Sequence, residues 1–76
     1  LSVRDRSLAT IAVTLAGYQS DQLRVHLQRG LDNGVTPQEI SELIAHVTLY
    51  SGFPTGVNAS RMFADILRER GIPLPD

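Results

Sequence analysis

Residues 22–58 of the 76-residue chain read QLRVHLQRGLDNGVTPQEISELIAHVTLYSGFPTGVN, and this stretch decides the fold. Two runs with helical spacing of apolar residues flank a three-residue turn that begins at Gly34. Glycine readily adopts the left-handed conformation that closes a helix. Thr36, Pro37 and Glu39 then form the pattern of a helix start, with a hydroxyl cap, a proline at the first position and a capping-box glutamate. The stretch predicts a central hairpin of two antiparallel helices.

The rest of the chain predicts two more helices, one on each side of the hairpin. We expect helices over about 2–17, 20–33, 37–51 and 54–71, followed by an extended tail over 72–76. Ser20 or Asp21 is expected to cap the second helix. Pro54 is expected to begin the last one, because proline disfavours a helical residue before it. No stretch alternates convincingly as a strand, so the chain is predicted to be one all-α, four-helix domain over residues 1–76.

The expected core follows from residues that repeat at helical spacing. The second and third helices carry apolar stripes at Leu23, Leu27 and Leu31, and at Ile40, Leu43, Ile44, Val47 and Tyr50. The first helix has little charge beyond its first turn, so we expect it to be buried on several sides. Gly30 costs roughly 1 kcal/mol relative to alanine inside a helix, and close approach of a neighbouring helix or ligand would explain it.

The composition restricts the function classes. The net charge of −1 argues against a general nucleic-acid binder, and there is no cysteine for a disulfide or a thiolate metal site. No apolar run approaches the ~20 residues of a membrane span, so no membrane partner is expected and the cytoplasm is the default location. The chain begins with Leu1 and not with methionine, so we expect residues upstream.

The two histidines, His26 and His46, are the main candidates for chemistry. They lie on the two arms of the predicted hairpin, at levels that differ by only ~3 Å along the helix axes. If the arms pack together, the imidazoles lie side by side, as acid–base catalysis would use them. The alternative is that each is a hydrogen-bonded helix residue. Glu42 lies one turn before His46 and could stabilise its imidazolium, or it is an exposed helix carboxylate.

Three further side chains complete the candidate set. Arg6 could bind a substrate carboxylate, although it could equally be a solvated residue of the first helical turn. Tyr50 and Phe53 could line a substrate pocket or belong to the core. No His-x-x-x-His pair is present, so we expect no metal site.

A combination of short segments resembles the carboxymuconolactone decarboxylase family. These segments are Arg6-Ser7-Leu8, His26-x-x-x-Gly30-Leu31-Asp32-Asn33-Gly34-Val35-Thr36, Glu39-Ile40, His46-x-x-x-Tyr50-x-Gly52-Phe53-Pro54 and Asn58-Ala59. The resemblance runs from about Leu1 to Leu67. It implies a fold shared with alkylhydroperoxidases, of orthogonal or antiparallel helices, with trimeric or hexameric assembly. Members are usually longer at the N-terminus, so an upstream helix is expected to be missing here.

The resemblance also separates two branches of chemistry. When the histidine of the peroxidase branch is aligned with His26, its two cysteines fall at Gln19 and Gln22, and its proton-relay glutamate falls near Ser7. Glutamine cannot form the thiolate that reduces a peroxide. The redox reaction is therefore not expected, and the decarboxylase branch, which needs no thiol and no cofactor, is favoured.

The leading hypothesis is a cofactor-independent decarboxylase of the 4-carboxymuconolactone type in aromatic-acid catabolism. It would act on a small carboxylate or lactone as a homotrimer or homohexamer. Its catalytic residues would be His26, His46 and Arg6, and its substrate-binding residues Glu42, Tyr50 and Phe53. His26 would deliver a proton and His46 would contact an oxyanion or carboxylate, although the two roles could be exchanged. The alternatives are a non-catalytic small-ligand binder and an oligomeric assembly module of the same fold.

Overall fold

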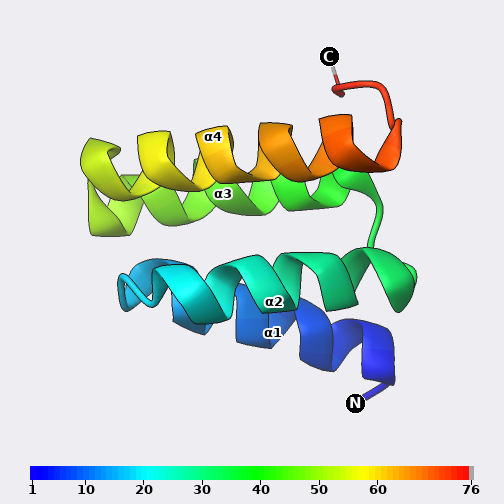
Figure 1. The fold of residues 1–76 in the computed structure, drawn as a ribbon. Coiled ribbons are helices and arrows are strands. Elements are labelled where there is room, and N and C mark those ends of the chain that lie inside the picture. Colours follow the sequence, from blue (N-terminus) through cyan, green and yellow to red (C-terminus); the bar gives the residue numbers. More distant parts are fainter. Residues whose placement is uncertain (76) are drawn as a thin grey trace.

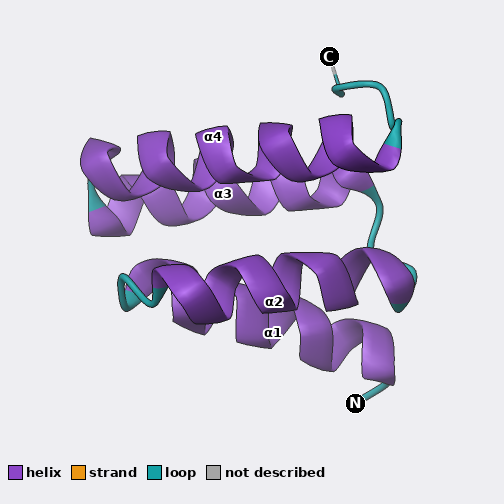
Figure 2. Cartoon of the chain, in the orientation of Figure 1, coloured by secondary structure: helices purple, strands orange, loops and turns teal. Residues whose placement is uncertain are grey.

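The computed structural model describes residues 1–75, which fold into four helices stacked as two layers of two (Figure 1). The helices are α1 (Val3–Ala16), α2 (Ser20–Asp32), α3 (Pro37–Ser51) and α4 (Phe53–Arg70). One layer holds α1 and α2, the other holds α3 and α4, and the two helices of each layer run antiparallel. Figure 2 shows short loops between the helices and no strand in this part of the chain. The predicted all-α, four-helix class is confirmed.

The turn between α2 and α3 carries the chain from one layer to the other. α1 packs against α2 and α3, and α4 packs against the same two helices, whereas α2 and α3 lie on a diagonal and touch at very few positions. The short antiparallel hairpin is therefore present, but its arms do not pack side by side. That part of the expectation is wrong because the apolar sides of α1 and α4 fill the space on either side of the diagonal.

The predicted start of α3 is confirmed in detail. The Thr36 hydroxyl accepts the Glu39 N–H at 3.1 Å, and the Glu39 carboxylate accepts the Thr36 N–H at 2.9 Å. Gly34 has the positive φ of 94° that closing α2 requires. Local hydrogen-bonding chemistry fixed this boundary, which explains why the sequence predicted it.

Two other helix starts differ slightly from the prediction. Gln19, and not Ser20 or Asp21, occupies the cap position of α2, and it makes no capping side-chain bond. α4 begins at Phe53, with Pro54 inside its first turn. The tail over 72–75 is irregular and not extended as predicted, because the Ile72 N–H donates back to the Leu67 carbonyl at 2.9 Å, and Asp76 lies outside the described residues.

The predicted stripes of α2 and α3 face the core, although Leu31 and Leu43 are only half-buried against it and Tyr50 lies outside it. Buried apolar side chains are Ile11, Leu15, Leu23, Leu27, Val35, Ile40, Ile44, Val47, Ala59, Phe63, Ile66 and Leu67. Tyr50 is 79% exposed, because it lies at the end of α3 with its ring against His46 on the outer surface. The outer side of α1 is also open, with Val13 70% exposed, so the expected burial of α1 on several sides is not found within one chain.

Two glycines let helices approach closely. A Cβ at Gly30 would lie 2.7 Å from Cδ1 of Ile11 in α1, which confirms the predicted close approach of a neighbouring helix. A Cβ at Gly56 of α4 would overlap the side chain of Thr48 in α3. The hydroxyl of that threonine already donates to the Ile44 carbonyl at 2.6 Å, so it is not free to move aside.

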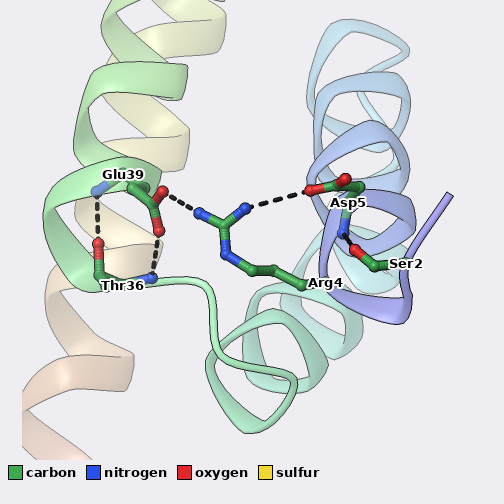
Figure 3. A network of polar contacts seen from close by, with 5 residues as sticks. All are labelled: Ser2, Arg4, Asp5, Thr36 and Glu39. Carbon is green, nitrogen blue, oxygen red and sulfur yellow. Dashed lines mark hydrogen bonds and ion pairs between the residues drawn. The ribbon is translucent and has the colours of Figure 1, made fainter.

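Arginine side chains link the helices at the end of the bundle that contains the N-terminus of α3. Figure 3 shows Arg4 of α1 between Asp5, at 3.1 Å, and the capping-box carboxylate of Glu39. The Thr36 N–H first, and Arg4 second, lower the pKa of Glu39. The same pair raises the pKa of Arg4, chiefly through the hydrogen bond to Glu39. The cap of α3 is therefore also an electrostatic link to α1.

Replacement of Gly56 by alanine should destabilise the bundle. Overpacking costs about 1–3 kcal/mol and alanine returns about 1 kcal/mol of helix propensity, so we expect a net loss of about 1 kcal/mol in unfolding free energy. Urea denaturation followed by circular dichroism measures it. The loss should shrink in a Thr48→Ala background, and Asn58→Ala on the exposed side of α4 is the control. An equal loss in both backgrounds would show that the Thr48 contact is not the cause.

The pH dependence of stability should report the Glu39 cap. Folding lowers the pKa of Glu39, so its ionised carboxylate contributes to the free energy of unfolding. This contribution is fully present above the ordinary glutamate pKa of about 4.3 and is lost as the pH falls through the pKa of the folded state. Glu39→Gln keeps an oxygen to accept the Thr36 N–H but removes the charge. Urea titrations from pH 7 to pH 3 should therefore show a weaker acid loss in Glu39→Gln than in Glu42→Gln. Identical pH profiles for the two variants would contradict this assignment.

Candidate functional site

His26 lies on the side of α2 that faces α1. It precedes Gly30, whose backbone lies against Ile11, by one helical turn. It precedes Asn33, whose side-chain amide donates to the Ser7 hydroxyl at 2.9 Å, by two turns. The imidazole is half-buried. This environment limits access of water without removing the side chain from the surface.

His46 lies exposed on the outer side of α3. Its ring centroid is 5.3 Å from that of Tyr50, with 58° between the ring planes. Glu42 lies one turn before His46 on the same exposed side. Glu39, two turns before His46, reaches Arg4 of α1, so this side of α3 also borders α1. The structure thus brings together three of the predicted residues, Glu42, His46 and Tyr50.

The two histidines therefore flank α1 from opposite sides and do not lie side by side. An α-helix with its side chains is about 10 Å across, which is too wide for one small substrate to touch both imidazoles through it. Arg6 lies on the exposed outer side of α1, two turns before Val13. One face of the molecule, centred on α1, therefore carries His26, His46 and Arg6 along its middle and edges.

Phe53 lies apart from that face. Its exposed ring lines an apolar groove of about 640 Å³ between α3, α4 and the C-terminal segment. The lining residues are Ser41, Ile44, Ala45, Thr48, Leu49, Phe53, Gly56, Val57, Ser60, Arg61, Phe63, Ala64, Leu67, Leu74 and Pro75. No histidine is among them. The groove and Arg61 were not predicted from the sequence. The signal that could have indicated them is Gly56, a glycine inside a helix that lets α4 approach α3 closely.

Residues 1–75 contain neither a metal-binding cluster nor a membrane-spanning helix. No cluster of three or more histidine, aspartate or glutamate side chains in this range has the proximity needed to bind a metal ion. Among these same residues, no helix combines the length and apolar character required to cross a membrane. The candidate functional residues lie on two surfaces, the α1-centred face and the groove.

Comparisons with known proteins agree with the motifs. The chain matches the carboxymuconolactone decarboxylase family over residues 1–65. It is 46% identical over 67 residues to 4-carboxymuconolactone decarboxylase of Acinetobacter baylyi, covering 88% of this chain and 50% of that protein. It is 32% identical over 59 residues to nitrosuccinic acid decarboxylase of Metarhizium robertsii, covering 78% of this chain and 41% of that protein. The chain spans about half the length of these relatives or less. No solved structure matches it significantly.

Proposed function

The chain belongs to the carboxymuconolactone decarboxylase family, and we propose that it acts as a cofactor-independent decarboxylase of the 4-carboxymuconolactone type in aromatic-acid breakdown. The observation that carries this proposal is the 46% identity to a 4-carboxymuconolactone decarboxylase across most of the chain. A second relative is also named as a decarboxylase of a small organic acid. The missing cysteines agree with a reaction that does not use a thiol.

The proposed reaction needs no cofactor because the substrate itself can delocalise the electron pair that loss of carbon dioxide leaves behind. When a carboxylate of an unsaturated lactone leaves as carbon dioxide, the carbon–carbon bond breaks and its electron pair spreads through the ring onto the lactone carbonyl oxygen. A proton then adds to ring carbon. The enzyme must hold the anionic substrate, stabilise the oxyanion and deliver that proton. Pre-placed hydrogen-bond donors and general acids typically contribute ~10²–10⁴-fold each to such reactions.

We assign these tasks to residues of the α1-centred face. Arg6 would hold a carboxylate, since its guanidinium fork matches that group. His26 would deliver the proton, which its half-buried position favours. His46 would contact the oxyanion, with Glu42 one turn before it on the same exposed side of α3 and Tyr50 packed against its ring. Phe53 lies in the groove and has no role in this assignment.

A second copy of the chain would complete this site. Because α1 separates the two histidines within one chain, the imidazoles can serve one substrate when His46 comes from a neighbouring copy. The exposed outer side of α1, with Val3 and Val13, supplies an apolar contact surface for such an assembly. The homotrimer or homohexamer expected from the sequence is part of this proposal.

Replacement of His26 tests the mechanism. On 4-carboxymuconolactone, His26→Gln should lower kcat at least about a hundredfold, because the proton donor is lost. Helicity and oligomer size should be unchanged. Stopped-flow or spectrophotometric turnover assays measure the rate, and Gln28→Ala on the same helix is the control. Near-parental kcat in both His26→Gln and His46→Gln would mean that the histidines are structural. No turnover by the parental chain would favour the ligand-binding alternative.

Size-exclusion chromatography coupled to light scattering tests the assembly. We expect a mass three or six times that of the 8.3 kDa chain. Val13→Arg should reduce this mass, because it places a charge on the outer side of α1. Val25→Arg, at a partly exposed position of α2, should leave the mass unchanged. A monodisperse 8.3 kDa species, or equal masses for both variants, would rule out assembly through α1.

A further inference from the structure

The groove between α3 and α4 has the properties of a small-molecule site, separate from the α1-centred face. Its volume of about 640 Å³ lies within the range of about 300–1,000 Å³ that is usual for such sites. Leu49 and Phe53, each 80% exposed, stand at its rim, and Leu74 contributes a further exposed apolar side chain. Large exposed apolar side chains gathered around a hollow commonly mark a binding surface.

Among the described residues that line this groove, Arg61 is the charged one. Asp65, one turn further along α4, binds Arg68 at 2.9 Å. Within residues 1–75, Arg61 takes part in none of the side-chain hydrogen bonds or ion pairs. Its positive charge is therefore available to an anion. The hydroxyl groups of Ser41 and Ser60 are the nearby polar groups that could orient one.

Arg61 also borders a second, smaller hollow of about 360 Å³ on the outer side of α4. The two hollows share Ser60, Arg61 and Ala64. The guanidinium thus lies where the apolar groove meets a more polar surface. A ligand with an apolar body and one anionic end would place its body in the groove and its charge at this border.

We propose that the α3–α4 groove binds a small organic carboxylate with a flat apolar ring. The ring lies against Leu49, Phe53 and Val57, which line the part of the groove near the α3–α4 connection, and the carboxylate forms a bidentate pair with Arg61, about two turns beyond Phe53 along α4. No histidine, aspartate or glutamate occurs among the described residues that line the groove, and binding alone is the role proposed for it. It is independent of the proposed decarboxylase activity and would exist even if that activity failed.

The test uses 2-naphthoate and its uncharged analogue 2-naphthamide as probes of the intact chain. Titrations followed by ¹H–¹⁵N NMR should show saturable shifts at the amides of Ala45, Leu49 and Ala64. Arg61→Gln should raise the Kd for naphthoate at least about tenfold, because the charged hydrogen bonds are lost. The same variant should leave the weaker binding of naphthamide unchanged. Phe53→Ala should weaken both probes, and Arg24→Gln, on α2, is the charge-matched control.

Several outcomes would overturn the proposal. One is naphthoate binding equally to the parental chain, Arg61→Gln and Arg24→Gln. Another is a set of shifts centred on His26 or His46, which would place the anion on the α1-centred face. A third is that the groove amides respond to protein concentration and not to either probe, since a second copy of the chain would then cover the groove. Absence of saturable shifts up to millimolar probe would also reject it.

Discussion

Burial of Val35 in a three-residue turn is the constraint on which the arrangement of all four helices depends. Its side chain is 2% exposed, and its N–H donates to the Gly30 carbonyl at 2.9 Å, so the turn folds back onto the end of α2. Thr36 then starts α3 at once in the other layer. Because the connection is so short, α2 and α3 take diagonally opposite positions in the bundle. The other two positions are occupied by α1 and α4. The core forms where the four apolar sides meet.

This diagonal arrangement separates the two surfaces to which we assign binding. α1 and α4 also face each other diagonally, so the outer side of α1 and the outer side of α4 look in different directions. The histidines border α1, from α2 on one side and α3 on the other. The groove lies between α3 and α4, where Gly56 lets the two backbones approach. A single helix, α3, contributes to both surfaces, with His46 on one and Leu49 on the other.

The features that the sequence predicted are those set by neighbouring residues. The cap at Thr36 and the end of α1 near Gly17 each depend on a few consecutive residues, and both are confirmed. The pairing of helices depends on contacts between residues that are distant in the sequence. The sequence places His26 and His46 at nearly the same height along the hairpin axes, but it does not reveal that α1 lies between them. Tyr50 fits the spacing of the α3 stripe but lies at its end, beyond the cover of neighbouring helices. The groove requires the α3–α4 packing, so no single segment encodes it.

The arginine links have a consequence for how the bundle opens. Arg4 and Arg70 both act at the end that holds the N-terminus of α3, where Arg70 donates to Asp32 at 2.9 Å and to the Gln28 side chain at 2.6 Å. Within residues 1–75, no arginine links the helices in this way at the opposite end of the bundle. Tyr18 at that end has a φ of 57°, a left-handed conformation that costs a non-glycine residue roughly 1–2 kcal/mol. Local unfolding begins in the least stable regions of a protein. The helices should therefore fray first around the α1–α2 and α3–α4 connections. Phe53 lies at this less restrained end of the bundle. The rim of the groove around Phe53 should therefore open more readily than the end that the arginine side chains hold together.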